Sequence, residues 1–194
     1  MFIKREIIML HKILITGTGR AGTSIIVAIL SLLEYKTGFS ADNIWDYMST
    51  PQKAGLECFR DSADYIHKQP LASLDIFDQF AIDHVIIPMR NIEHSAKSRE
   101  KVQGDSKKPV DGGFVRSTTY QQQIHHNANY LGFLFSLLVD RDIPYTIIKF
   151  PKLVYDDGAY LFEQLLSPFP DLKDKQQEYF KVFREIVHPE WINF

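Results

Sequence analysis

Residues 12–34, with the sequence KILITGTGRAGTSIIVAILSLLE, constrain the fold of this chain more than any other segment. Residues 12–16 are a short apolar run rich in β-branched side chains, which predicts a buried strand. Residues 17–22 contain three glycines, and residues 23–34 are apolar on nearly every side, which predicts a helix packed deeply against a sheet. This combination favours an anion site, because the turn directs backbone N–H groups inward and the helix N-terminus adds partial positive charge.

The glycine turn matches two phosphate-binding motifs. Residues 17–22, GTGRAG, are an unbroken G-x-G-x-x-G, the dinucleotide-binding pattern. The spacing of Gly17, Gly22 and Ser24 also fits the nucleotide-triphosphatase loop G-x-x-x-x-G-K-[ST], but Thr23 stands in the lysine position. That lysine contacts the β- and γ-phosphates, so its replacement argues against ordinary NTP hydrolysis or kinase chemistry. The cation inside the turn is Arg20.

A dinucleotide-binding fold requires a second strand that ends in Asp or Glu about 20 residues beyond the glycines. Asp42 is available in the segment YKTGFSADNIWDY, but the residues before it are a poor match to a buried parallel strand. The glycine motif alone therefore leaves two alternatives open. One is an NAD(P)-binding oxidoreductase in which Asp42 contacts a ribose, and the other is a nucleotide loop of a different kind.

Composition and charge fit an ordinary globular domain. The 194 residues are enough for a sizeable core, so residues 1–194 are interpreted as a single domain. The net charge of −2 shows no basic excess for nucleic acid or a membrane surface, and we expect neither a signal peptide nor a membrane span. Cys58 is the only cysteine, which rules out an intrachain disulfide and favours a reducing, cytoplasmic location.

Strand and helix patterns alternate along the rest of the chain. Strands are expected at 64–68, 84–89 and 143–150, helices at 71–80, 91–101 and 120–139, and further helices beyond 160. Residues 36–61 are expected to form loops and short helices, and residues 103–113 form a loop that either faces solvent or closes over a pocket. This alternation predicts an α/β doubly wound domain with a central parallel sheet flanked by helices.

A second polar segment follows the strand expected at 84–89. Arg90 stands at the strand's carboxyl end, and Ser98 comes eight residues later, within the next helix. A guanidinium and a hydroxyl in these positions can converge on one anion. The alternative is that the charged side chains of this helix simply face water. No metal-ligand spacing occurs, and the adjacent His125 and His126 are expected on different helix faces.

Taken together, these segments resemble the sulfotransferase family that uses 3′-phosphoadenosine 5′-phosphosulfate (PAPS). Residues 17–24, GTGRAGTS, are similar to the family's loop G-x-x-R-[SA]-G-T-[ST], which wraps the 5′-phosphosulfate without a Walker lysine. Arg90-Asn91 and Ser98 resemble the residues that hold the 3′-phosphate. Residues 65–70, YIHKQP, look like the strand ending in Lys-x-Pro of many bacterial and Golgi-like members. Residues 143–166 are similar to a later strand and helix, although Lys152 replaces the usual acidic residue.

The resemblance implies a P-loop-like three-layer α/β sandwich. It also implies in-line transfer of a sulfuryl group from PAPS to a hydroxyl or amine of a small-molecule or glycan acceptor, with 3′,5′-ADP as the product and no metal. Arg20 would stabilise charge on the bridging oxygen of the leaving group, and Lys68 could share that task. The residues implied in cofactor binding are Gly19, Arg20, Ala21, Gly22, Thr23, Ser24, Arg90 and Ser98.

A general base should deprotonate the acceptor, and the sequence leaves its identity open. The candidates are His67, beside Lys68, and Glu57 or Asp61 in the preceding loop. His67 and Lys68 point to opposite sides of the expected strand, so both cannot easily face one site. A further alternative is a non-catalytic, P-loop-like nucleotide-binding protein, which would have a nucleotide site without a workable base nearby.

Overall fold

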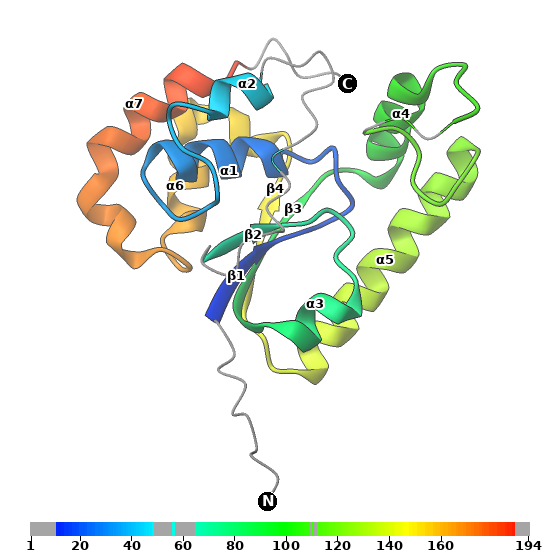
Figure 1. The fold of residues 1–194 in the computed structure, drawn as a ribbon, viewed down its shortest axis with the longest axis horizontal. Coiled ribbons are helices and arrows are strands. Elements are labelled where there is room, and N and C mark those ends of the chain that lie inside the picture. The colour runs from blue at the N-terminus through cyan, green and yellow to red at the C-terminus, as the bar shows by residue number, and fades with distance from the viewer. Residues whose placement is uncertain (1–10, 49–55, 57–64, 109, 111, 189–194) are drawn as a thin grey trace, which may run out of the picture.

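The computed structural model describes residues 11–48, 56, 65–108, 110 and 112–188 (Figure 1). Along the described chain the elements are β1 (His11–Ile15), α1 (Thr23–Leu32), α2 (Ile44–Met48), β2 (Ile66–Lys68), α3 (Leu74–Gln79), β3 (Ala81–Met89), α4 (Ile92–Gln103), α5 (Tyr120–Asp140), β4 (Tyr145–Lys149), α6 (Ala159–Leu165) and α7 (Gln176–Ile186). Three short 3₁₀ helices lie between β4 and α7: η1 (Lys152–Val154), η2 (Asp156–Gly158) and η3 (Pro170–Lys175).

The described strands form one parallel sheet in the order β2-β1-β3-β4. Parallel neighbours need crossover connections, and helices supply them here. The central strand β1 is paired on both sides, so that Ile13 lies opposite Ile66 of β2 and His84 of β3. The α/β class with a central parallel sheet flanked by helices, expected from the sequence, is therefore confirmed.

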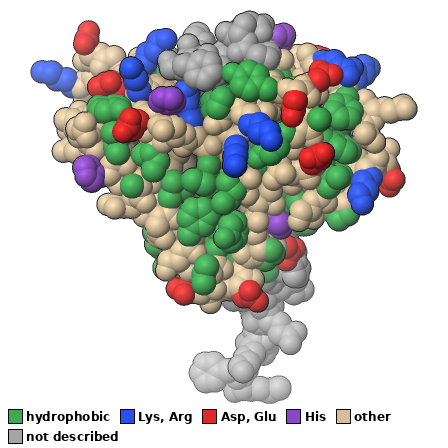
Figure 2. Space-filling model, turned by 180° about the vertical axis from the view of Figure 1, so that it is seen from behind, with side chains coloured by type: hydrophobic (Ala, Val, Ile, Leu, Met, Phe, Trp, Pro, Cys, Tyr) green, Lys and Arg blue, Asp and Glu red, His purple; other side chains and the backbone are tan. Residues whose placement is uncertain are grey.

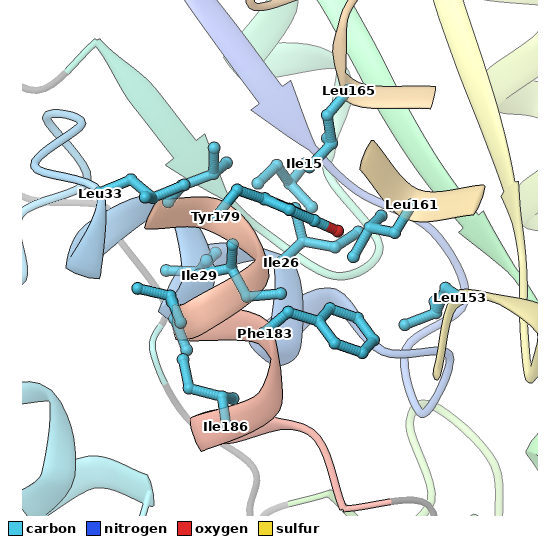
Figure 3. Packing of buried hydrophobic residues seen from close by; sticks show 14 of the residues in the cluster. Ile15, Ile26, Ile29, Leu33, Leu153, Leu161, Leu165, Tyr179, Phe183 and Ile186 are labelled. Carbon is cyan, nitrogen blue, oxygen red and sulfur yellow. The ribbon is translucent and has the colours of Figure 1, made fainter. Parts of the chain in front are cut away.

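One face of the sheet is covered by α1, α6 and α7 (Figures 1 and 3). Ile15 of β1 points into this layer, where Tyr179 and Phe183 of α7 pack against α1 and α6. The hydroxyl of Tyr179 donates to the carbonyl oxygen of Gly158 over 3.0 Å, so the one polar atom of this buried ring has a partner. The apolar helix expected at 23–34 is thus buried between sheet and α7.

The other face of the sheet is covered by α3 and α5 (Figure 1). Leu14, the neighbour of Ile15, points into this second layer because successive side chains of a strand alternate in direction. Val85 and Ile87 of β3 join it and contact the cluster that contains Leu134 of α5. Two helical layers around one parallel sheet are consistent with a three-layer sandwich.

Two expected boundaries, the start of α3 and the start of β3, differ from the structure by three residues, and others differ by one or two. The helix expected from residue 71 begins only at Leu74, because Leu71 has φ 57° and its N–H donates to the carbonyl oxygen of Gly17. A left-handed residue cannot belong to a right-handed helix, and the bond instead ties this turn to the glycine loop. The strand expected at 84–89 begins earlier, at Ala81, where it pairs with His11.

Strand β4 is an edge of the sheet, with β3 as its only neighbour among the described strands. Its side chains Tyr145 and Ile147 are 43% and 37% exposed. Figure 2 shows the face opposite to that of Figure 1, where hydrophobic side chains gather near the middle and acidic and basic side chains are interspersed around them. Within the described residues, no helix combines the length and apolar character needed to cross a membrane.

Candidate functional site

The glycine loop lies at the carboxyl edge of the sheet, between β1 and α1. Strand β1 has β2 on one side and β3 on the other, so the strand order changes direction between β1 and β3. In open α/β sheets, ligands bind outside the carboxyl ends of the strands at such a reversal. The loop after β1 and Arg90, which follows β3, flank this position.

The loop backbone takes conformations that favour glycine. Gly19 and Gly22 have φ values of 72° and 91°. A Cβ atom on Gly19 would collide with the guanidinium of Arg99, and one on Gly22 would lie 2.9 Å from Cδ2 of Leu153. Arg20 also has a left-handed backbone, with φ 56°, which is uncommon for a residue with a side chain. The loop is therefore held in a bent path by its surroundings.

Three consecutive carbonyl groups of the loop accept hydrogen bonds from residues that follow β3. Nη2 of Arg99 donates to Thr18 O over 2.7 Å, and Oγ of Ser95 donates to Gly19 O over 3.1 Å. A longer bond of 3.4 Å joins Nη1 of Arg90 to Arg20 O.

These bonds also fix the direction of the loop's N–H groups. In a trans peptide, the C=O of one residue and the N–H of the next point in opposite directions. The N–H groups of Gly19, Arg20 and Ala21 consequently point away from the side chains that hold the carbonyls. The first N–H groups of α1 follow directly, and no described side chain caps that helix end. The loop thus has the orientation needed to present backbone donors to an anion.

The side chain of Arg20 joins the two motifs that were singled out in the sequence. Its Nε donates to Oγ of Ser98 on α4 over 3.1 Å, although the two residues are 78 positions apart. Arg90 packs beside them, with its guanidinium carbon 5.0 Å from the centroid of the Phe150 ring. Ser98 and Arg90 are buried, so the alternative that this helix only presents charge to water does not describe them.

Lys68 approaches the loop from the opposite side. It is the last residue of β2, and its Nζ donates to Oγ of Ser24 over 3.0 Å, in the first turn of α1. The side chain is 1% exposed. A lysine from the neighbouring strand therefore brings a cation to the loop in which Thr23 replaces the lysine of nucleotide triphosphatases.

The arginines around the loop form a cluster of positive charge in which Arg90 and Arg99 are buried and Arg20 is partly buried. Burial lowers the pKa of Arg20. Burial first, and then the charge of Arg20, lower the pKa of Arg90 and bring that of Arg99 down to about 10. Each shift means that the charged form is less stable here than in water. An anion bound between these groups would offset that cost.

The structure separates His67 from Lys68, as expected for neighbours on a strand. His67 is 2% exposed and faces the α3 side, where its ring centroid lies 4.9 Å from that of Phe80. This position gives no support to His67 as the general base. Glu57 and Asp61, the other candidates, lie outside the described residues.

The NAD(P)-binding alternative predicts that Asp42 ends a second strand, and this prediction is wrong. Asp42 does not end a second strand: it is exposed and lies in a turn before α2. The next strand that the structure describes after α1 is β2, at Ile66–Lys68.

Sequence reasoning missed the roles of Ser95 and Arg99. Ser95, Ser98 and Arg99 are all buried, and their spacing places them on one face of α4. The sequence contained a sign of this role. A helix packed on a core has apolar residues at three- and four-residue spacing, whereas the residues of this helix at that spacing are polar. A row of polar side chains on a buried helix face indicates that these side chains bind the backbone of another segment or a ligand.

No family model matches the chain, and neither a curated protein nor a solved structure matches it. Among the described residues, no group of three or more His, Cys, Asp or Glu side chains could hold a metal ion. The functional assignment consequently rests on the residues of the loop and on the side chains gathered around it.

Proposed function

We propose that the chain is a PAPS-dependent sulfotransferase whose donor site lies at the loop between β1 and α1. The observation that carries this proposal is the hydrogen bond from Arg20 to Ser98, because it unites the glycine loop with the segment that follows β3. These are two of the segments on which the family resemblance rests. PAPS carries negative charge at two separate positions, the 5′-phosphosulfate and the 3′-phosphate, and such a donor requires two anion-binding groups.

In this proposal the loop backbone binds the 5′ end of the donor. The N–H groups of residues 19–24 supply donors, and the N-terminus of α1 adds partial positive charge. Lys68 and Arg20 stabilise the negative charge that grows on the leaving group. Bound PAPS supplies the sulfuryl group, which is transferred to a hydroxyl or amine of the acceptor.

Arg90 and Ser98 hold the 3′-phosphate. The ring of Phe150 and the carbonyl of Arg20 orient the guanidinium of Arg90, so that little side-chain freedom is lost when the anion binds. The Ser98 hydroxyl accepts from Arg20 and keeps its own proton to donate to a phosphate oxygen.

The contact between Lys68 and Ser24 favours this donor over a nucleoside triphosphate. In P-loop triphosphatases, the hydroxyl at this position holds Mg²⁺. Here an ammonium group lies 3.0 Å from that hydroxyl, and a divalent cation placed beside it would be repelled. The transferred sulfuryl group carries less charge than a phosphoryl group, so lysine and arginine are sufficient to stabilise it.

Replacing Arg90 by Ala tests the assignment of the 3′-phosphate. We expect the affinity for 3′,5′-ADP to fall by about tenfold or more, because a hydrogen-bonded charge pair is lost. The affinity for 5′-AMP, which lacks the 3′-phosphate, should hardly change. Calorimetric titration of both nucleotides without added metal measures the two affinities.

The matched control is Arg184→Ala, which removes an exposed arginine of α7 whose carboxylate partner is Asp157. It should leave both affinities unchanged. An equal loss of 3′,5′-ADP and 5′-AMP binding in the Arg90 variant would contradict the role given to Arg90.

A further inference from the structure

An open hollow lies at the start of α5, outside the donor site proposed above. Its volume is about 550 Å³. Its lining carries a guanidinium, two hydroxyls, two imidazoles and two carboxamides, from Arg116, Ser117, Thr118, His125, His126, Gln122 and Asn129. None of the described residues that line it is acidic or apolar. Such a lining fits a ligand with several hydroxyl groups and one negative charge, and it does not fit a flat apolar ring.

His125 and His126 were expected on different faces of the helix, but both line this hollow, and their nitrogen atoms can bind such a ligand. Nδ1 of His125 lies 2.9 Å from the carbonyl oxygen of Gln121, which can only accept, so this nitrogen carries the proton. In this tautomer, Nε2 of His125 is an acceptor for a ligand hydroxyl. Nε2 of His126 is buried and has no hydrogen-bond partner among the described residues. A buried nitrogen without a partner is rare in folded proteins, and a ligand group would satisfy it.

Positive charge dominates the hollow. Burial lowers the pKa of His126, and the charges of Arg116 and Arg99 lower it further. Arg116 has φ 51°, a left-handed backbone that costs about 1 kcal/mol or more for a residue with a side chain. Strained residues of this kind gather at ligand sites, where the surrounding structure holds them in place.

Hydrogen bonds join residues 113–117, which form one wall of the hollow, to the donor loop. Arg99 donates through Nη1 to Gly113 O and through Nη2 to Thr18 O, both over 2.7 Å. Oε1 of Gln123 accepts from the N–H of Val115 and from Oγ of Ser117, which fixes the wall against α5. One buried guanidinium therefore contacts both the loop and the segment that leads into the hollow.

We propose that this hollow binds a sugar that carries an anionic group, with Arg116 facing the anion and the two histidines facing its hydroxyls or the anion. Its role as the acceptor subsite rests on the proposed function, because an acceptor is needed here only if the loop binds the donor of a transferred group. The binding itself is independent of that function.

The test uses D-glucuronate and D-glucose 6-phosphate as probes and D-glucose as the neutral reference. Binding is followed by the NMR signals of the imidazole C2 protons, assigned with the variants His125→Gln and His126→Gln. We expect both anionic sugars to shift the His126 signal and to bind about tenfold more tightly than glucose, as one added charge-assisted hydrogen bond predicts. Preference for one of the two identifies the anion as carboxylate or phosphate.

Arg116→Gly is the informative variant, because glycine accepts the left-handed backbone and only the guanidinium is lost. It should weaken glucuronate binding about tenfold while leaving the affinity for 3′,5′-ADP unchanged. Arg184→Ala is the control for a general loss of positive charge. Saturation with 3′,5′-ADP should not displace the sugar.

Three results would overturn the proposal: equal affinity for glucose and glucuronate, glucuronate binding that survives in Arg116→Gly, or competitive displacement by 3′,5′-ADP. The two proposals fail separately. If Arg116-dependent sugar binding holds and 3′,5′-ADP does not bind, the hollow remains a ligand site and the sulfotransferase assignment falls.

Discussion

Arg99 helps to hold the glycine loop in its bent path. Its guanidinium is buried, and its two terminal nitrogens donate to Thr18 O and Gly113 O. Burial and the charge of Arg20 lower its pKa to about 10, so it is still protonated at neutral pH. A buried cation held by backbone carbonyls turns those carbonyls toward itself and the following N–H groups away, which prepares the loop for an anion.

Gly19→Ala should disrupt this arrangement. The new Cβ would meet the Arg99 guanidinium, and φ 72° is unfavourable for alanine. We expect a loss of about 1–2 kcal/mol in the free energy of unfolding together with weaker 3′,5′-ADP binding. Urea denaturation and calorimetric titration measure the two effects.

Gly132→Ala is the matched control, because this glycine lies on the exposed side of α5 with nothing within 4 Å of an added Cβ. Alanine is a better helix former than glycine, so this change should raise stability by up to about 1 kcal/mol. An increase in stability for Gly19→Ala as well would contradict the close contact between Gly19 and the Arg99 guanidinium.

At the scale of the elements, α5 fixes the end of β1 where the loop begins. The hydroxyl of Tyr130 lies 2.7 Å from Oγ1 of Thr16, which also accepts from the N–H of Ala72 over 3.3 Å. Burial raises the pKa of Tyr130 to about 12, so the phenol keeps its proton. Helix, strand and the turn after β2 thus meet at one threonine.

Tyr130→Phe should therefore lower stability by about 1–2 kcal/mol, because a buried hydroxyl of Thr16 loses a partner. Tyr155→Phe, which removes a hydroxyl from an exposed ring, should change stability by no more than about 0.5 kcal/mol. Thermal or urea unfolding of both variants provides the comparison. A loss of the same size in both would mean that the Tyr130 hydroxyl does not tie α5 to β1.

Helices and strands could be predicted where the pattern of apolar residues within one segment determines them. The strand at 12–16, the buried helix after it and the long helix from Tyr120 follow from apolar periodicity and agree closely with β1, α1 and α5. The start of α3 could not be predicted in this way. Leu71 has helical spacing to Leu74, but a backbone bond to Gly17 in a distant loop holds it outside the helix.

At the scale of the whole molecule, the order of the strands in the sheet brings the residues of the candidate site together. The order β2-β1-β3-β4 places the ends of β1, β2 and β3 next to one another, which brings Lys68, the glycine loop and Arg90 together from three parts of the chain. The sequence pointed to each of these residues but gave no distance between them. The polar face of α4 could have pointed to Ser95 and Arg99, but their partners are backbone carbonyls of distant segments, which the sequence does not identify.

The most direct test of the central claim is calorimetric titration of the unmodified protein, without added metal, with 3′,5′-ADP, 5′-AMP, ATP and NAD. The account predicts that 3′,5′-ADP binds most tightly, at least about tenfold better than 5′-AMP, because only it engages Arg90 and Ser98 through a second phosphate. Preference for ATP or NAD, or no binding of 3′,5′-ADP, would contradict the assignment of the loop as a PAPS donor site.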